Sequence, residues 1–391
     1  MRGHIKQRSN GSYSIVLDLG KDTDTGKRKQ KWITVRGNKK EAEKELAKHL
    51  NDYNTGSFVE PSKLTVGEFL KRWLVDYAET KVSPKTLERY RGIVDQHLIP
   101  ELGHLPLARL QPLHIQGHYT KLMKGGRKDG REGGLSPQTI LHHHRLLHKA
   151  LEMAVKWLIV ARNVADAVEP PTVTEREVEA IDEVQSAWLM DAAIGTRLYT
   201  PIFLAIAAGL RRGEILGLRW SDLDTDLGVL KIQRSVEETK SGTRIKEPKT
   251  KRGRRTIALP QVALEALEIH RAAQDERKAI LKSDYEDSDL ICCSDMGKLW
   301  TPSAFTSAYR DLLKRRKLTG PNFHALRHSH ASHLLKAGVD IKMLSQRLGH
   351  SRTAFTLDKY VHILPGQDDE AAKRVNVALK LAIDGTHKRV M

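Results

Sequence analysis

Cysteine is scarce in this chain, and the two that occur do not suggest a site. Cys292 and Cys293 are the only cysteines among 391 residues, and they are adjacent. A disulfide between neighbours would be strained, and a zinc site would lack its other ligands. We therefore interpret both as small buried residues in a strand.

Long hydrophobic runs are also absent. No stretch approaches the roughly 20 apolar residues that span a bilayer, and the polar start MRGHIKQRSNGSYS lacks the apolar core of a signal peptide. The expected location is therefore the cytoplasm. At 391 residues the chain is too long for one ordinary core, which predicts two or three domains.

Acidic residues are outnumbered by basic ones. The sequence has 66 Lys and Arg against 48 Asp and Glu, which gives a formal net charge of +18. Such an excess predicts a polyanionic partner, because phosphate contacts release condensed counterions. By charge alone, the partner is DNA, RNA or an anionic membrane.

The first 56 residues predict a small basic sheet with one helix. Alternating β-type runs occupy 12–19 and 30–37, a turn-rich segment joins them, and a helix-like stretch covers 39–53. The turn carries three candidate contacts to a polyanion, Lys27, Arg28 and Lys29. A solvated, charged hairpin is the alternative interpretation.

Residues 64–168 predict a helical domain. Thr65 and Glu68 have the spacing of a capping box, and two further helix starts carry Ser before Pro, at Ser83 and Ser136. The last helix contains four histidines without a cysteine or carboxylate at ligand spacing: His142, His143, His144 and His148. We interpret them as core and surface histidines, not as a metal site.

A segment with Pro170 and Pro171 predicts an extended linker, and the third domain, 174–391, follows it. Its segment 199–220 is an apolar helix that breaks at Gly209 and resumes with Arg211 and Glu214. A guanidinium at a helix junction beside a carboxylate suits capture of a phosphate. A purely structural Arg-Glu pair fits equally well.

Residues 229–260 contain two β-like runs joined by a densely basic turn, which predicts a hairpin. Most of its cations suit plain phosphate contacts, while one lysine could donate a proton to a leaving oxygen. The cations are Lys249, Lys251, Arg252, Arg254 and Arg255.

The segment PNFHALRHSHASHLLKAG predicts a helix that closes at Gly338 and carries His324 and Arg327 on one face. Three other histidines there are interpreted as packing or solvent residues: His328, His330 and His333. A short helix ends at Gly349 and His350, and Tyr360 follows. A tyrosine in such a position is most often a core residue.

Taken in order, GLRRGE, PKTKRGRR, HALRH, LGH and DKY resemble the full signature of the tyrosine recombinases, the phage-integrase family that includes lambda integrase. The resemblance covers the whole chain. It implies a mainly α fold with small β elements in three parts. These are an arm-type DNA-binding domain (1–56, a three-stranded sheet plus helix), a SAM-like core-binding domain (64–168), and an α+β catalytic domain with a C-terminal tail (174–391).

Carried over by residue, the resemblance makes Tyr360 the nucleophile, and Arg211 and Arg327 the arginines on the scissile phosphate. Lys249 is implied as the general acid, with Lys251 two residues away as the alternative. The other implied catalytic residues are His324, His350 and Glu214. No metal or other cofactor is implied, because the arginines take the role that metals take elsewhere.

The implied activity is cutting and rejoining of duplex DNA through a 3′-phosphotyrosyl bond, as in integration or excision of a phage or mobile element. The implied partners are core and arm attachment sites, three further copies of the chain, and a directionality factor or DNA-bending protein, but no membrane. The tail helix within 368–384 docks either on a neighbouring subunit or on its own domain. The rival functions are a type IB topoisomerase, a host recombinase and a DNA-binding regulator that does not cut.

Overall fold

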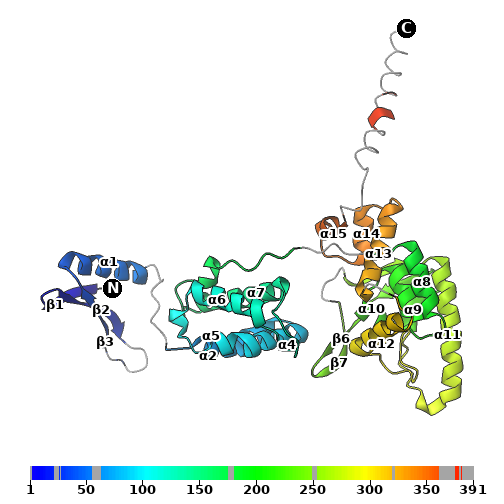
Figure 1. Cartoon of the computed structure of the whole chain (residues 1–391), viewed down its shortest axis with the longest axis horizontal. Helices are drawn as coiled ribbons and strands as arrows, with labels where there is room; N and C mark the ends of the chain where they lie inside the picture. The colour runs from blue at the N-terminus through cyan, green and yellow to red at the C-terminus, as the bar shows by residue number, and fades with distance from the viewer. Residues whose placement is uncertain are drawn as a thin grey trace, which may run out of the picture. The chain divides into compact units, whose positions relative to one another are not determined.

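The computed structural model describes residues 2–21, 26, 28–54, 63–174, 180–248, 253–318, 322–360, 375–377 and 380. The chain forms two compact units, Met1–Glu175 and Arg176–Met391. It is mainly helical with small sheets (Figure 1), as the sequence predicted. No helix among the described residues is long and apolar enough to cross a membrane.

The first unit begins with the predicted antiparallel sheet, in the strand order β1 (Arg2–Ser9), β2 (Ser12–Lys21) and β3 (Arg28–Arg36). The helix α1 (Lys39–Asn54) packs against it (Figure 1). The middle strand, β2, pairs with a strand on each edge. Its buried hydrophobic side chains are Ile15, Val16 and Leu17.

The basic turn of this sheet is only partly described. Arg28 is exposed and its Nε donates to Asp18 over 3.0 Å, so this cation is held at the end of the strand. Lys27 and the side chain of Lys29 lie outside the described residues. Their predicted contacts to DNA therefore stay predictions.

Helices form the rest of the first unit. In chain order they are α2 (Val66–Trp73), η1 (Leu74–Ala78), α3 (Glu79–Lys81), α4 (Pro84–Ile93), η2 (Val94–Leu98), α5 (Ile99–Leu102), η3 (Leu107–Arg109), α6 (Pro112–Gly125), α7 (Pro137–Lys156) and η4 (Val164–Ala167). The predicted capping box opens α2, since Thr65 Oγ1 accepts from Glu68 N over 3.2 Å and Glu68 Oε2 accepts from Thr65 N over 2.8 Å. Ser136 caps α7, whereas Ser83 bonds the Thr86 hydroxyl instead of the helix backbone.

The helices from α2 onward in the first unit share one apolar core, which includes Phe69, Leu70, Trp73, Ile140, Leu147 and Leu151. Two buried histidines, His118 and His143, lie in it with ring centroids 6.4 Å apart. Within the part of the chain that the structure describes, both His118 nitrogens and Nδ1 of His143 have no hydrogen-bond partner. No group of three or more potential ligands is placed to hold a metal within the described ranges.

The second unit is a helical layer with two small sheets (Figure 1). Its helices are α8 (Glu183–Ala193), α9 (Tyr199–Ala208), α10 (Arg212–Leu216), η5 (Trp220–Asp222), α11 (Gln261–Leu281), η7 (Lys282–Asp284), α12 (Pro302–Arg315), α13 (Phe323–Lys336), α14 (Ile341–Leu348) and α15 (Thr353–Tyr360). One sheet has the order β4 (Leu223–Asp224), β5 (Val229–Ile232) and β8 (Arg255–Ala258); the other pairs β6 (Ser235–Thr239) with β7 (Gly242–Lys246).

Two expectations for this unit need correction. The runs β5 and β8 do pair, but an extra hairpin, β6–β7, lies between them, so the connection is longer than one basic turn. Its strands are mostly polar, with Val236 as their buried apolar residue, which is why hydrophobic alternation did not reveal them. Cys292 and Cys293 lie in a bend with a single β-bridge to Leu299, not in a strand.

We expect acid to destabilise the first unit through its two buried histidines. Burial lowers the pKa of His118 to about 4 and that of His143 to about 3. In the unfolded chain a histidine has a pKa near 6.5, so it binds a proton more readily than the buried rings do. The free energy of unfolding that the two histidines contribute is therefore complete above about pH 6.5 and is lost as the pH falls toward 4 and 3. The urea midpoint of the full chain should therefore drop between neutral pH and pH 5.

The control for this prediction is an exposed histidine of the same unit. His118→Leu should flatten the dependence of the urea midpoint on pH, because the titrating ring is gone. His104→Gln should leave that dependence unchanged, since His104 is exposed. Equal pH profiles for wild type and His118→Leu would contradict the assignment.

Candidate active site

A glycine at the junction of α9 and α10 positions the first candidate residue. Gly209 ends α9 with φ of 65°, and a Cβ there would approach His330 Cδ2 to 2.5 Å. The chain turns sharply there, and Arg211 caps the N-terminus of α10. Its guanidinium reaches Glu214 Oε1 at 2.7 Å, and Glu214 Oε2 accepts from the Arg211 backbone N–H at 3.0 Å. The predicted Arg-Glu pair is present.

Glu214 is held by a second arginine from another element. Arg255, the first residue of β8, donates from Nη2 to Glu214 Oε2 at 2.9 Å and from Nε to the carbonyl of Arg347 at 2.7 Å. Burial opposes the charge on Glu214, but the bond to Arg255 and the charges of Arg255 and Arg211 lower the pKa of this carboxyl group to about 2. Glu214 is therefore an anion between two cations.

Arg327 is the most deeply placed cation of the site. Its residue is 2% exposed, and it bonds three groups from two neighbouring loops. Nη1 donates to the Gly209 carbonyl at 2.6 Å, while Nη2 donates to the Leu348 carbonyl at 2.6 Å and lies 3.0 Å from His350 Nε2. Burial and the charge of Arg211 lower the pKa of Arg327 to about 9, which leaves it charged at neutral pH.

His350 follows the left-handed Gly349 that ends α14. Its Nε2 faces a donor, Arg327, so Nδ1 carries the ring proton and donates to Thr356 Oγ1 at 2.8 Å. Burial and the charge of Arg327 lower the pKa of His350 to about 3. In this arrangement His350 is neutral and accepts from Arg327.

His324 lies one turn before Arg327 on α13, as predicted. Desolvation and then the charges of Arg327 and Arg211 lower the pKa of His324. Its ring centroid lies 5.0 Å from that of His328, with the two rings perpendicular. The first histidine of the motif HALRH thus lies within the same cluster as both arginines.

Tyr360, the last residue of α15, is 2% exposed. Its hydroxyl oxygen lies 2.6 Å from His328 Nδ1. Burial raises the pKa of Tyr360 to about 12, with Arg327 acting in the opposite direction. His328 had been interpreted as a packing or solvent residue, and the sequence signal that could have found it is its place directly after Arg327 in the motif HALRH.

A pocket of about 370 Å³ opens beside these groups. Arg211, Glu214 and His350 line it, together with Lys246 and Ser235. Lys246, the last residue of β7, is ion-paired with Glu237 and was not singled out from the sequence. The pocket therefore has a cationic lining that suits a phosphate group.

The other basic residues of the predicted turn differ in exposure and in their partners. Lys249, Lys251 and Arg252 lie outside the described residues. Arg254 is exposed and paired with Glu247, so it can reach an external phosphate. The Arg255 side chain is 7% exposed and bound to Glu214, so its described position corrects the expectation of a free phosphate contact.

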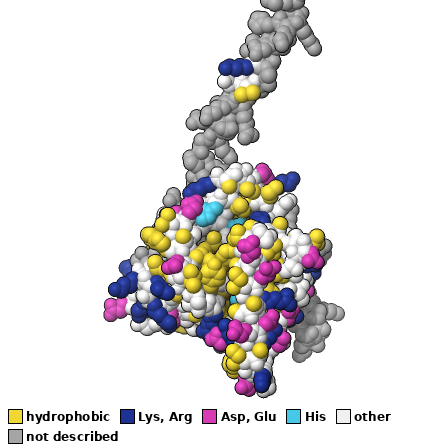
Figure 2. Space-filling model, turned by 90° about the vertical axis from the view of Figure 1, so that its right-hand side faces the viewer, with side chains coloured by type: hydrophobic (Ala, Val, Ile, Leu, Met, Phe, Trp, Pro, Cys, Tyr) yellow, Lys and Arg dark blue, Asp and Glu magenta, His cyan; other side chains and the backbone are white. Residues whose placement is uncertain are grey.

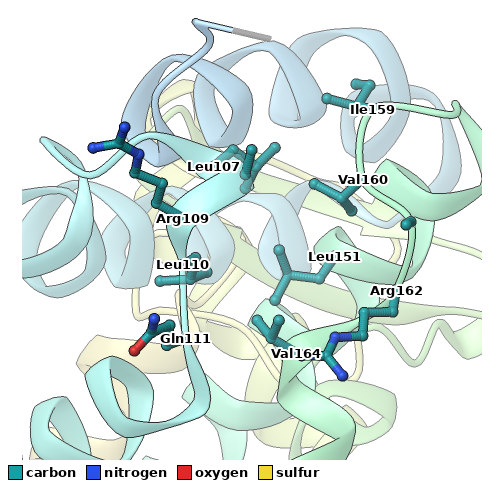
Figure 3. Close-up of a pocket in the computed structure, with 11 residues that line it drawn as sticks. Leu107, Arg109, Leu110, Gln111, Leu151, Ile159, Val160, Arg162 and Val164 are labelled. Carbon is teal, nitrogen blue, oxygen red and sulfur yellow. The ribbon is translucent and has the colours of Figure 1, made fainter. Parts of the chain in front are cut away.

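Two larger pockets lie elsewhere and are mainly apolar. In the first unit, Leu107, Leu151 and Val160 converge on a pocket of about 550 Å³, with Arg109 and Arg162 at its edges (Figure 3). In the second unit, a pocket of about 590 Å³ lies between α11 and the loop after α8. Hydrophobic side chains gather on one face of the unit (Figure 2). Ile269 lines this pocket. Neither pocket contains the candidate catalytic residues.

The sequence matches two family descriptions. Residues 172–366 match the Phage integrase family, and residues 65–123 match the N-terminal SAM-like domain of phage integrases. A XerC-like tyrosine recombinase of Caldanaerobacter subterraneus is 28% identical over 93% of this chain and 95% of its own length. The ICEBs1 integrase of Bacillus subtilis is 25% identical over 95% of this chain and 99% of its own.

Solved structures share the fold. A Tn1549 transposon integrase in complex with a circular intermediate DNA superimposes with a TM-score of 0.66 at 19% identity, covering 80% of this chain and 99% of that one. A lambda integrase tetramer bound to a Holliday junction gives a TM-score of 0.54 at 19% identity, over 89% of this chain and 96% of that one.

We expect Glu214→Ala to lower the free energy of unfolding by about 3–5 kcal/mol, because it leaves the buried guanidinium of Arg255 without its counter-charge. Urea unfolding followed by circular dichroism measures this. Glu265→Ala, an exposed carboxylate on α11, is the matched control and should change stability little. A Glu214→Ala protein as stable as this control would contradict the role given to the buried pair.

Proposed function

The chain belongs to the phage integrase family, the tyrosine recombinases, and on that premise we propose that Tyr360 cleaves DNA whose phosphate is held by Arg211 and Arg327, beside the pocket that Arg211 lines. The chain is a site-specific recombinase that cuts and rejoins DNA strands, as its relatives from mobile elements indicate. The residue roles below are our proposal.

One observation carries this proposal. Three other segments approach Arg327 of α13: the end of α9, which is 118 residues away in the sequence, the end of α14, and α15 through the charge interaction with Tyr360. If these sequence motifs served only to form helices, their residues would not need to lie around a single guanidinium group. Their convergence supports a common task at a phosphate.

The two arginines suit the charge change of the reaction. A phosphate gains negative charge as a nucleophile attacks it, and fixed guanidinium groups stabilise that charge without reorganising. Attack by Tyr360 yields a 3′-phosphotyrosyl ester that keeps the energy of the broken bond, so a 5′ hydroxyl can reverse the step. Rejoining then requires no ATP.

The remaining residues support these three. Glu214 orients Arg211 and Arg255 through its two carboxylate oxygens, which makes it a positioning residue. His324 and His350 flank Arg327: we propose that His324 contacts a phosphate oxygen once the substrate enters, while His350 accepts from Arg327 and helps to orient its guanidinium. We propose Lys249 as the acid that protonates the leaving 5′ oxygen, with Lys251 as the alternative.

We propose duplex DNA as the partner, bound at a core site by residues 64–168 and 174–391 and at an arm site by residues 1–56. Phosphate contacts are assigned to two sets of cations: Lys27, Arg28 and Lys29 in the first, and Lys251, Arg252 and Arg254 in the second. The tetramer of lambda integrase on a Holliday junction supports four copies of the chain on DNA. The tail that could link them lies mostly outside the described residues.

Further proposals follow from the mobile-element relatives. The chain integrates or excises a phage or another mobile element, with a directionality factor or DNA-bending protein as possible assistants. Because the substrate is DNA, we place the protein in the cytoplasm.

The first test traps the covalent intermediate. The substrate is a duplex selected from a random pool by binding to the chain and nicked near the cleavage point, so that the cut fragment diffuses away. We expect wild type to give a slow-migrating protein-DNA band on a denaturing gel without divalent metal, and Tyr360→Phe to give none, because it lacks the nucleophilic oxygen. Tyr309→Phe is the control, since Tyr309 is a buried tyrosine of α12.

Tight binding without any adduct in wild type would favour the non-cutting regulator instead. An adduct that persists in Tyr360→Phe would assign the nucleophile to another residue.

The second test separates the two candidate lysines. Loss of the general acid should slow cleavage on the order of 10²- to 10⁴-fold. A bridging 5′ sulfur in place of oxygen leaves as a thiolate, whose conjugate acid has a pKa of about 8.5, and needs no proton. We expect Lys249→Ala to cleave the sulfur substrate much faster than the oxygen substrate. Lys251→Ala should cleave the two substrates at similar rates.

The opposite pattern would make Lys251 the acid. If sulfur rescued neither variant, neither lysine would be the proton donor.

A further inference from the structure

Tyr360 has a partner to which the mechanism above gives no role. His328, one residue after Arg327 on α13, places Nδ1 2.6 Å from the hydroxyl oxygen of Tyr360 on α15. The contact joins two elements that are separate in the sequence. It therefore depends on how α13 and α15 pack, and it touches the atom that attacks the phosphate.

The burial of Tyr360 indicates which group donates in this hydrogen bond. A buried hydroxyl needs an acceptor for its hydrogen, and within the described residues the Tyr360 hydroxyl has one hydrogen-bond partner, His328 Nδ1. If Nδ1 carried the ring proton, the phenolic hydrogen would be buried without an acceptor. The consistent arrangement has the proton of His328 on Nε2 and the phenol donating to Nδ1.

The surroundings of His328 are positively charged. The groups that face it are His324 and Arg327 on α13, Lys359 on α15 and His350 after α14. Burial, then His324, Lys359 and Arg327, lower the pKa of His328 to about 4, so the ring is a neutral acceptor at physiological pH. In this setting a further positive charge on His328 is unfavourable.

A DNA phosphate changes this balance. Held by Arg211 and Arg327, it brings negative charge close to His328 and offsets the cations that disfavour imidazolium. The same arginines stabilise a developing phenolate, since Arg327 already opposes the raised pKa of Tyr360. Removal of the phenolic proton is therefore favoured only when the substrate is bound.

We propose that His328 is the general base that accepts the proton of Tyr360 during cleavage, an inference that rests on the proposed function. As the phenolic oxygen bonds to phosphorus, its O–H bond breaks and the proton moves to Nδ1, forming an imidazolium. The bond from phosphorus to the 5′ oxygen breaks, and that oxygen takes a proton from the lysine. In rejoining, the 5′ hydroxyl returns its proton to the lysine while His328 returns its own to Tyr360.

His324 is the other histidine close to the nucleophile, and it does not share this contact. It lies one turn earlier on α13, and within the described residues the hydroxyl of Tyr360 bonds His328 and not His324. A base must lie within hydrogen-bond reach of the proton that it removes. Geometry thus assigns the base to His328 and leaves His324 beside the phosphate arginines.

The test measures single-turnover cleavage of the nicked duplex from about pH 6 to pH 9, a range that lies above the pKa of His328 and below that of Tyr360. His328→Asn places an amide oxygen near the position of Nδ1, where it can accept a hydrogen bond but cannot take a proton. His328→Ala removes both functions. His333→Asn, on the same helix and away from Tyr360, is the matched control, and DNA binding and thermal unfolding of each variant verify the fold.

We expect both His328 variants to cleave more slowly at neutral pH, on the order of 10²- to 10³-fold. Their rates should rise about tenfold per pH unit, because hydroxide must then remove the proton, whereas wild type should vary little. A fluorinated tyrosine at position 360 has a more acidic phenol and should recover part of the lost rate in His328→Asn. His333→Asn should behave as wild type.

Three results would overturn the proposal. Wild-type rates in both His328 variants would exclude a base, and a slower rate with the wild-type pH profile would indicate a structural role. Faster cleavage in His328→Ala would show that the contact only restrains the tyrosine. Absence of any adduct in wild type is a different failure, since it would remove the proposed function itself.

Discussion

The buried guanidinium of Arg327 is the constraint on which the rest of the site depends. It bonds the carbonyl groups that end α9 and α14, and it contacts His350, so the segments carrying the other motifs are tied to one charged group. Burying a cation is unfavourable unless its donors are matched. The two glycines at these helix ends, Gly209 and Gly349, adopt left-handed conformations that present the carbonyl groups to it.

A second buried charge, the carboxylate of Glu214, offsets only part of the positive charge of the site. Glu214 is the carboxylate that the two outer arginines, Arg211 and Arg255, both contact, so three guanidinium groups share one acid. The surplus of positive charge favours a phosphate in the adjoining pocket and also disfavours protonated histidines around it. Burial keeps Tyr360 protonated, while Arg327 acts in the opposite direction on its pKa.

Much of the fold could be predicted because its signals are local. Capping at Thr65, the glycine breaks at Gly209 and Gly338, and the periodicity of the helices depend on a few neighbouring residues, and these were confirmed. The β6–β7 hairpin was missed because its polar strands have little apolar alternation. Likewise, Ser83 has a good capping sequence, yet its hydroxyl bonds the hydroxyl of Thr86, since local preference does not decide between that hydroxyl and the backbone N–H groups of the helix.

The sequence by itself determined the family, the helix boundaries near the site, and the order of the candidate residues, because each rests on residue types at fixed short spacings. Tertiary structure alone decided which side chains touch. It turned Arg255 inward to Glu214, oriented His350 as an acceptor toward Arg327, and brought His328 to Tyr360. These contacts join residues far apart in the chain or on separate helices, and only the packing of those elements sets such distances.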